Sequence, residues 1–291
     1  MFSGALTAMV SPFRGGRLDE ARLRQNVEFQ IAQGINGLVP VGTTGESPTV
    51  DWQEHKRVIE ITVEVAAGRV PVIAGVGANA TNEAIELHAF AKSVGATAGL
   101  SVNPYYNRPS QEGLYRHFAT LADRVDLPIV LYNIPSRTGV TMTAQTVARL
   151  AAHKNIAAIK EATGSIDMTS EIVSLCDLPV LSGDDSLTLP LMSVGARGVI
   201  SVLSNLVPAR IAALCRHAAA GQFAEAAKVH HALFPLMRAM FLDGNPAGIK
   251  HAMSVAGMDT GELRLPLWEA NDATKRQIEA RMIEAGVPVL V

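Results

Sequence analysis

The stretch Asn155-Ile156-Ala157-Ala158-Ile159-Lys160-Glu161-Ala162-Thr163-Gly164 is a short apolar run that ends in a lysine, with Thr and Gly just behind it. Its length and composition indicate a buried β-strand. Because side chains alternate along a strand, Ile156, Ala158 and Lys160 should share one face and Ile159 the other. The small side chain of Ala158 leaves space beside the stem of the lysine.

Lys160 has two interpretations. A lysine among Ile and Ala side chains is costly as a cation, so burial would favour a neutral amine that is free for nucleophilic attack. Alternatively, Lys160 only marks the end of the strand and reaches to water, as lysines usually do. The rest of the chain has to decide between them.

Apolar runs of strand length alternate with amphipathic helical stretches along the chain. The predicted strands are residues 5–10, 37–41, 71–76, 98–102, 128–133, 156–160, 179–182 and 198–202. They are continuously apolar, as expected when both faces of a parallel sheet are covered. Eight β-then-α units predict a closed (β/α)8 TIM barrel. A doubly wound open sheet is the alternative, but no Gly-rich dinucleotide turn follows the first strand.

The chain divides into two predicted regions. Residues 1–221 hold the barrel and the active site, and residues 222–291 form a C-terminal helical appendage with helical segments at 223–241, 246–256 and 268–285. The appendage exceeds what a closed barrel needs, so we expect it to serve in assembly. No low-complexity linker separates the two regions.

Composition excludes several classes of protein. The 291 residues are 48% hydrophobic and carry a net charge of −2 without a basic run, so nucleic acid and anionic membranes are not expected partners. Cys176 and Cys215 lie in helical-looking segments and suggest buried, inert thiols rather than disulfides. The first residues lack the features of a signal peptide, and charges, Gly or Pro interrupt every apolar run. We expect a cytoplasmic protein.

Polar residues follow several of the predicted strands. In such barrels the chemistry lies at the carboxyl ends of the strands. Gly42-Thr43-Thr44-Gly45-Glu46-Ser47 follows the second strand, where Val39, Val41 and Thr43 should share the inward face. Two hydroxyls between glycines form a natural cradle for a carboxylate. The alternative is a Gly-rich turn whose Thr or Ser caps the next helix.

Aromatic and basic residues follow the fourth and fifth strands. Tyr105 and Tyr106 lie in a loop that prolines stiffen, and Tyr132 should point inward beside Lys160. Arg137, just above Tyr132, could hold a carboxylate through two hydrogen bonds. Each has a structural alternative: an interface tyrosine, an ordinary buried tyrosine or a surface arginine.

Asp184 and Asp185 follow the seventh strand and raise the question of a metal site. No His or Glu stands at ligand spacing around them, and His230, His231 and His251 lie far away in the appendage. Capping of the next helix is therefore the preferred interpretation of the two aspartates. A metal-dependent aldolase or dehydratase that uses them remains an alternative. The sequence contains no HExxH, Walker, GxSxG or zinc-type cysteine pattern.

The polar residues converge on one end of the predicted barrel. A strand-end lysine, a strand-end tyrosine, a Thr pair and an arginine suit Schiff-base chemistry on a 2-oxo acid. In that reaction the amine attacks the ketone, and the hydroxyls carry protons through carbinolamine, imine and enamine. This convergence favours the nucleophilic interpretation of Lys160.

The motifs resemble the dihydrodipicolinate synthase/N-acetylneuraminate lyase family of pyruvate-dependent class I aldolases. The resemblance covers nearly the whole chain, through GTTGES from Gly42, NPYYNRPSQEGLY from Asn103, YNIPSRTG from Tyr132, KEATG from Lys160, SGDD from Ser182 and GVISV from Gly198. It implies that Lys160 forms an imine with pyruvate, without a metal or other cofactor. It also implies a proton relay of Tyr132, Thr43 and Tyr106, with Tyr106 contributed across a dimer interface.

The resemblance further implies the substrates and the assembly. Thr44 would bind the pyruvate carboxylate, Arg137 the carboxylate of L-aspartate 4-semialdehyde, and Gly183 and the backbone of Ile200 would line the pocket. The product would be 4-hydroxy-tetrahydrodipicolinate, used in lysine and diaminopimelate biosynthesis. The expected assembly is a homotetramer of two tight dimers.

Branch assignment within the family rests on fewer residues. Two features favour the synthase over the sialic acid lyases, namely the pair Thr43-Thr44 and Arg137. The lyases usually carry Ser-Thr in place of Thr43-Thr44, and they lack the Ser-Arg-Thr-Gly segment that contains Arg137 here. A sugar-acid aldolase or dehydratase of the family is the alternative, and a non-catalytic ligand-binding paralogue is a third. One departure from the family pattern is the segment 245–250, Asn-Pro-Ala-Gly-Ile-Lys. Because it is remote from Lys160 in sequence, we expect it to affect assembly rather than catalysis.

Many synthases of the family are inhibited by L-lysine at a site on the dimer interface. The matching positions here are Ser47, Trp52, His55, Asn79, Glu83 and Tyr105. Asn79 and Glu83 could hold the carboxylate and the amine of an amino acid, and Trp52 could stack on its aliphatic stem. Trp52 could equally be a surface residue of its helix that packs on a neighbour.

Overall fold

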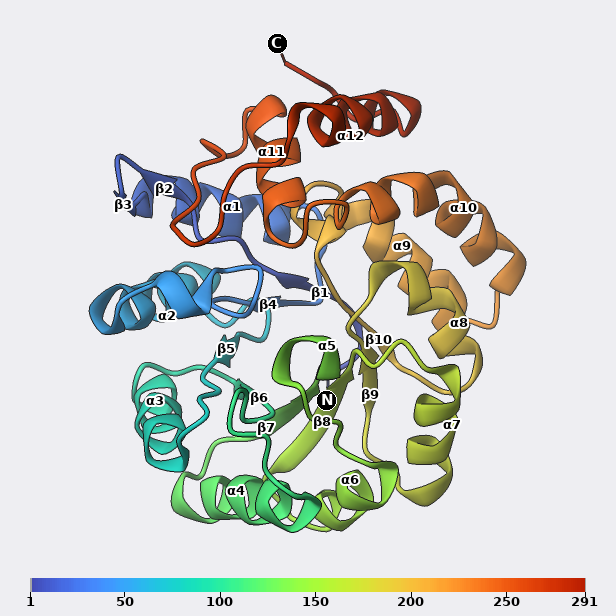
Figure 1. Ribbon diagram of the computed structural model, residues 1–291. Coiled ribbons are helices and arrows are strands. Elements are labelled where there is room, and N and C mark those ends of the chain that lie inside the picture. The colour runs from blue at the N-terminus through green and yellow to red at the C-terminus, as the bar shows by residue number, and fades with distance from the viewer. Residues whose placement is uncertain (1, 291) are drawn as a thin grey trace.

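The computed structural model describes residues 2–290 and contains a barrel of eight parallel strands (Figure 1). The strands are β1 (Gly4–Ala8), β4 (Gly37–Val39), β5 (Ile73–Gly75), β6 (Ala98–Val102), β7 (Ile129–Asn133), β8 (Ile156–Glu161), β9 (Val180–Ser182) and β10 (Gly198–Ser201). Their order in the sheet is β4-β1-β10-β9-β8-β7-β6-β5. A parallel bridge between Leu38 and Val72 joins the two ends of this order and closes the barrel. The predicted (β/α)8 fold is confirmed.

A helix follows each strand of the barrel and packs on its outside (Figure 1). These helices are α1 (Glu20–Ala32), α2 (Trp52–Ala66), α3 (Thr81–Ser93), α4 (Gln111–Arg124), α6 (Ala144–Ala151), α7 (Ile166–Leu175), α8 (Thr188–Ser193) and α9 (Pro208–Ala219). Side-chain caps fix where several of them begin. Asp19 accepts from the backbone N–H of Arg22, and Asp51 accepts from those of Gln53 and Glu54.

Two layers of apolar side chains surround the sheet. The larger one lies between the strands and the helices, and the smaller one fills the barrel interior. The interior layer comprises Phe2, Leu6, Ala8, Val39, Ile73, Ala98, Leu100, Val130, Tyr132, Ala158, Leu181 and Ile200. The barrel is therefore a packed core, and only its carboxyl end is left for chemistry.

Strand β8 departs from regular alternation. Ile129 of β7 pairs with Ile156, but the next residue, Val130, pairs with Ala158, so the register shifts at this point. Ile156 packs in the outer layer with Ile159, whereas Ala158 lies in the interior. The prediction that Ile156 shares the face of Ala158 and Lys160 is therefore wrong, because it assumed a regular strand.

Strand β4 is shorter than predicted. It ends at Val39, and Val41 has a φ of 46° and packs in the outer layer, so Val41 does not share the inward face with Val39. A hairpin of β2 (Phe13–Arg14) and β3 (Arg17–Leu18) was absent from the predicted elements, although the Gly15-Gly16 turn between them is a recognisable signal. The short helix α5 (Pro135–Thr138) near the centre of the ring in Figure 1 was also not predicted.

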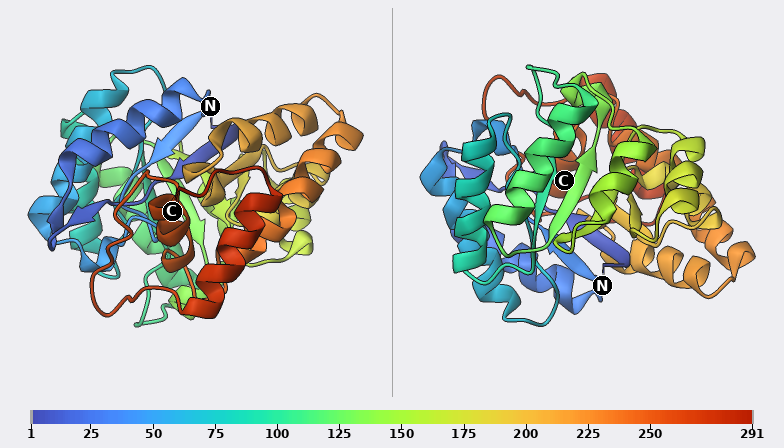
Figure 2. Two further views of the ribbon diagram at one scale, coloured as in Figure 1. Left: turned by 90° about the horizontal axis from the view of Figure 1, so that it is seen from above. Right: turned by 90° about the horizontal axis from the view of Figure 1, so that it is seen from below.

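The C-terminal region forms α10 (Phe223–Ala239), α11 (Ala247–Val255) and α12 (Asp272–Glu284). Figures 1 and 2 show α11 and α12 outside the ring of barrel helices. The last helix begins at Asp272 rather than at Trp268, because Asn271 caps it. Residues of 222–290 share the outer core with residues of 2–221, and positions 1 and 291 of the two predicted regions lie outside the described residues. No helix within residues 2–290 combines the length and apolarity that a membrane crossing needs.

Several histidines are buried in this fold. His117 on α4 is 6% exposed, and its Nδ1 hydrogen-bonds with the Thr81 hydroxyl at 2.9 Å. Burial lowers the pKa of His117 from 6.5 to about 4, and burial also lowers the pKa of His55 and His88. These imidazoles are therefore neutral in the folded protein at neutral pH, while the unfolded chain takes up protons below about pH 6.5.

We expect acid to destabilise the fold through His117. Its contribution to stability is fully present above pH 6.5 and is lost as the pH falls from 6.5 to about 4, by about 3 kcal/mol in total. The variant His117→Gln should show a flatter fall of unfolding free energy across this range, measured by urea denaturation at several pH values. Comparison of the two proteins at pH 8 corrects for the packing that the imidazole ring provides. Parallel curves for the two proteins between pH 6.5 and 4 would contradict the assignment.

Candidate active site

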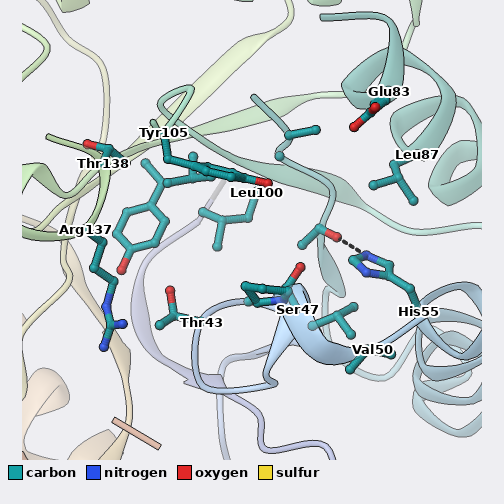
Figure 3. Close-up of a pocket in the computed structure, with 18 of the residues that line it drawn as sticks. Thr43, Ser47, Val50, His55, Glu83, Leu87, Leu100, Tyr105, Arg137 and Thr138 are labelled. Atoms are coloured by element: carbon teal, nitrogen blue, oxygen red, sulfur yellow. Dashed lines mark hydrogen bonds between the residues drawn. The ribbon is translucent and has the colours of Figure 1, made fainter. Parts of the chain in front are cut away.

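A cavity of about 520 Å³ opens at the carboxyl end of the barrel strands. It is lined by residues that follow β4, β5, β6 and β7 together with residues of α2, α3 and α5, including Gly42, Thr43, Ser47, Trp52, His55, Glu83, Tyr105, Tyr132 and Arg137. Figure 3 shows Thr43 and Arg137 at one end of the cavity and His55 and Glu83 at the other, with Leu100 and Tyr105 between them. One chain therefore brings residues of the predicted catalytic site and of the predicted lysine site into a single space.

Lys160 and Tyr132 are neighbours at the ends of β8 and β7. They pair in register, and the Lys160 Nζ lies 4.2 Å from the centroid of the Tyr132 ring. Lys160 is 5% exposed and Tyr132 is 4% exposed. The interpretation in which Lys160 merely marks the strand end and reaches to water is therefore wrong. Tyr132 reaches the cavity, and the lysine amine lies next to it.

The loop after β4 carries the Thr pair. Thr43 lines the cavity, although the strand alternation that predicted its direction ends at Val39. Thr44 is buried, and its Oγ1 accepts a hydrogen bond from Asn245 Nδ2 at 3.0 Å. Within residues 2–290, the backbone N–H groups of Thr43 and Thr44 donate to no protein acceptor. The loop can thus offer two N–H groups and a hydroxyl to an anion.

Arg137 approaches the same end of the cavity from α5. Its Nη2 donates to the backbone oxygen of Asn245 at 3.2 Å, so the side chain and the main chain of Asn245 contact two predicted substrate-binding residues. The segment 245–250 thus reaches the predicted substrate site although it is remote from Lys160 in sequence, and its effect on assembly stays a prediction. Distance in sequence concealed a direct contact between this segment and the site.

The two aspartates after β9 do not cap the helix that follows them. Asp184 makes no side-chain cap at the short turn η2 (Asp185–Leu187). The Asp185 carboxylate instead accepts from Ser201 Oγ and from the backbone N–H groups of Val202 and Leu203, in the loop after β10. Capping of the following helix is thus the wrong interpretation of both side chains.

Asp184 lies in the electrostatic field of Lys160. Burial raises the pKa of the Asp184 carboxyl, and the positive charge of Lys160 acts against that rise. The adjacent Gly183 donates its N–H to the Glu161 oxygen at 2.7 Å, and a Cβ there would lie 2.5 Å from that of Ala162. Gly183 therefore permits the close approach of the β8 and β9 ends that brings Asp184 toward the lysine. Ile200 of β10 is fully buried in the barrel interior.

The residues predicted for lysine binding extend from the middle of the cavity, at Ser47 and Tyr105, to its far end at His55 and Glu83 (Figure 3). Five of them line the cavity: Ser47, Trp52, His55, Glu83 and Tyr105. Asn79 joins this group because its Nδ2 donates a hydrogen bond to the backbone oxygen of Tyr105 at 3.3 Å. His55 Nε2 hydrogen-bonds with Gly75 O at 2.7 Å. Burial, followed by the charge of Glu83, raises the pKa of Tyr105. Trp52 is half-exposed, with the Lys56 ammonium 5.7 Å from its ring centroid.

Tyr106 stands apart from the other predicted site residues. Its φ is 74°, and its side chain is 91% exposed. It does not line the cavity of its own chain. A single chain thus brings together Lys160, Tyr132, Thr43 and Arg137, with Thr44 just behind, but not Tyr106.

Sequence reasoning named Asp184 and Asn245 but did not assign either of them to the active site. Asp184 had a usable signal, because it follows a barrel strand at the end where chemistry collects. Asn245 had none in the strand pattern, since it is 201 residues from Thr44 in the chain. Among residues 2–290, no three His, Cys, Asp or Glu side chains are grouped as metal ligands.

The fold and this array of side chains define a (β/α)8-barrel lyase. The chain belongs to the dihydrodipicolinate synthetase family, whose sequence model matches residues 1–285. It is 51% identical over 289 residues to the 4-hydroxy-tetrahydrodipicolinate synthase of Geotalea uraniireducens, covering 99% of this chain and 100% of that one.

Solved structures agree with this assignment. A chloride-inhibited dihydrodipicolinate synthase from Acinetobacter baumannii complexed with pyruvate is 40% identical, with a TM-score of 0.97 and coverage of 99% of this chain and 100% of that one. The enzyme of Cyanidioschyzon merolae with lysine bound is 37% identical, with a TM-score of 0.96 and coverage of 100% and 99%. The resemblance seen in the sequence motifs is confirmed at the level of the family.

Proposed function

We propose that this chain condenses pyruvate with L-aspartate 4-semialdehyde through an imine on Lys160, giving 4-hydroxy-tetrahydrodipicolinate for lysine and diaminopimelate biosynthesis. The observation that carries the proposal is the buried Lys160 amine, 4.2 Å from the centre of the Tyr132 ring at the carboxyl end of the barrel. The name of the relative that shares half of its residues supports the choice of substrates, and the pyruvate complex of a structural neighbour supports the first of them.

The chemistry follows from an amine and a ketone. The Lys160 nitrogen adds to the ketone carbon of pyruvate, and the carbinolamine loses water to give an imine. Loss of a methyl proton gives an enamine, whose carbon attacks the aldehyde carbon of the second substrate. The amine of that substrate then displaces Lys160, which closes the ring and frees the enzyme. No step needs a metal or another cofactor.

The neighbouring side chains supply proton transfer and anion binding. Tyr132 and Thr43 border the same cavity, so they are placed to pass protons between the reacting oxygen and solvent. The free N–H groups of the Thr43-Thr44 loop and the Thr44 hydroxyl bind the pyruvate carboxylate. Arg137 binds the carboxylate of the second substrate, and Gly183 and the Ile200 backbone border the pocket.

The third member of the relay comes from a second copy of the chain. Tyr106 is 91% exposed beside the cavity-lining Tyr105, a position that suits insertion into a neighbouring subunit. Two chains that exchange Tyr106 form a tight dimer, and two dimers form a homotetramer. The reaction takes place in the cytoplasm, which agrees with two cysteines that form no disulfide, one of them with a pKa that burial raises to about 12.

L-Lysine binds at the far end of the cavity and inhibits the reaction. Glu83 takes the amine, Asn79 the carboxylate, and Trp52 stacks on the aliphatic stem, with Ser47, His55 and Tyr105 around them. Supporting this, five of these six residues line the cavity, and the structural neighbour from Cyanidioschyzon merolae has lysine bound.

Borohydride reduction in the presence of pyruvate tests the imine. We expect peptide mass mapping to find a reduced pyruvyl adduct on Lys160, in enzyme first treated exhaustively with EDTA. Lys160→Arg should give no adduct, while Lys154→Arg, at an exposed lysine nearby, should label normally. Tyr132→Phe should slow adduct formation by roughly 10²-fold, because it loses a proton donor. A wild-type enzyme without an adduct on Lys160 would refute the mechanism.

Active-site complementation tests the shared Tyr106. Lys160→Ala and Tyr106→Phe should each be nearly inactive alone. Co-expressed, they should regain about a quarter of wild-type activity, because random pairing gives half mixed dimers with one intact site each. The assay pairs pyruvate with L-aspartate 4-semialdehyde, and N-acetylmannosamine and glyceraldehyde serve as control aldehydes. Activity that stays at the level of the single variants would place Tyr106 outside the neighbour's site.

Titration with L-lysine tests the inhibitory site. We expect the wild-type rate to fall as lysine rises, and Glu83→Gln to weaken inhibition roughly tenfold, because a charged hydrogen bond to the amine is lost. The uninhibited rate of the variant should match that of the wild type. A wild-type rate that is constant up to millimolar lysine would reject the site.

A further inference from the structure

A fully buried ion pair joins the C-terminal region to the active-site loop. Lys250 of α11 and Glu46 of the loop after β4 both have side chains of 0% exposure, and Lys250 Nζ donates to Glu46 Oε1 at 2.5 Å. They lie 204 residues apart in the chain. Burial lowers the pKa of Lys250, and Glu46 opposes that change. The removal of two charges from water is costly, so this pair needs a physical reason.

The pair has several partners, and the charge of the buried Asp259 also opposes the fall in the pKa of Lys250. Lys250 Nζ also donates to the Glu262 backbone oxygen at 2.6 Å and lies 4.2 Å from the centroid of the Phe13 ring. Glu46 Oε2 accepts from the Arg264 backbone N–H at 3.1 Å. The carboxylate of Glu46 is therefore fixed on both oxygens by residues of the C-terminal region. Both charges are hydrogen-bonded, as a stable buried pair requires.

Glu46 belongs to the loop that presents Thr43 and Thr44. Its backbone has a φ of 55°, and its N–H donates to Thr43 O at 3.1 Å, so its position is directly coupled to that of Thr43. A non-Gly residue in this left-handed conformation is strained and persists only where its surroundings hold it. The chain preceding α11 makes a second contact with the same loop, through the hydrogen bond from Asn245 Nδ2 to Thr44 Oγ1.

We propose that Lys250 and Glu46 are positioning residues for the Schiff-base reaction, which fix the loop so that Thr43 faces the Lys160 imine and Thr44 faces the pyruvate carboxylate. The inference rests on the proposed function, and it assigns to α11 a role in catalysis. Neither residue touches substrate. Arg137 stands on α5 and has no hydrogen bond with Glu46 or Lys250; its contact with the C-terminal region is the bond to the Asn245 oxygen.

Steady-state kinetics of Lys250→Met test the proposal. We expect kcat to fall by roughly 10- to 100-fold and the KM for pyruvate to rise, because a small displacement of the loop misplaces Thr43 and Thr44. The KM for L-aspartate 4-semialdehyde should rise less than that for pyruvate, since Arg137 is positioned by α5 and contacts the C-terminal region through the Asn245 oxygen rather than through Lys250 or Glu46. A matched control is Ile278→Ala in α12, which opens the core at a residue of 0% exposure away from the loop. It should lower thermal stability while both KM values stay at the wild-type level.

A neutral double variant covers the case in which Lys250→Met leaves Glu46 uncompensated and the protein fails to fold. Glu46→Gln/Lys250→Met leaves neither member of the pair without its countercharge, and the buried Asp259, whose pKa burial raises, can take up a proton when Lys250 is absent, so this variant should fold. Its kcat should remain reduced by about tenfold or more, because the lysine bond to the loop is absent. A folded single or double variant with wild-type kcat and KM for pyruvate overturns the proposal. Absence of a pyruvate imine in the wild-type enzyme instead overturns the proposed function, so the two failures are distinguishable.

Discussion

The register between β7 and β8 is the constraint on which the site depends. It places Tyr132 level with Lys160 inside the barrel and Asn133 level with Glu161 outside it. Outside the barrel, Asn133 Nδ2 donates to Glu161 Oε2 at 3.1 Å, and the Thr163 N–H donates to Glu161 Oε1 at 2.6 Å. The bond from Asn133 to Glu161 holds β7 and β8 in the register that places Tyr132 beside Lys160 inside the barrel. A slip of one residue would reverse both faces and separate the amine from the phenol ring.

Burial and nearby groups determine the charge environment of Lys160 and Tyr132. Lys160 lies against an aromatic face and in the electrostatic field of the partly buried Asp184. Asp185 turns away and is satisfied by Ser201 and two backbone N–H groups. Adjacent aspartates thus have different roles, one within the electrostatic field of the amine and one hydrogen-bonded to the loop after β10. Their environments separate them, although their sequence positions look equivalent.

The strand pattern predicted the barrel and the catalytic end of it well, for a physical reason. Parallel strands buried on both faces are continuous apolar runs, and their carboxyl ends meet at one edge, so Lys160, Tyr132, Thr43 and Arg137 converge without knowledge of any contact. The prediction failed where the backbone is irregular. The register shift before Ala158 moved Ile156 to the outer layer, and the positive φ of Val41 ended β4 early. The spacing of apolar residues in the sequence indicates neither the register shift nor the positive φ.

The strand pattern also could not predict the contacts of Asn245 with Thr44 and of Lys250 with Glu46, whose partners are 201 and 204 residues apart in the chain. The chain between β4 and α2 spans residues 40–51 and includes Glu46 with a φ of 55°, a conformation that persists in a non-Gly residue only where its surroundings hold it. A fixed external surface is therefore needed to set the direction of Thr43, and the C-terminal region provides it through Asn245 and Lys250. This explains why the helices that a closed barrel does not need still pack into its outer apolar core. The C-terminal region supports the loop after β4 through these contacts, since a carboxylate cradle built on a mobile loop would lose its alignment with the imine.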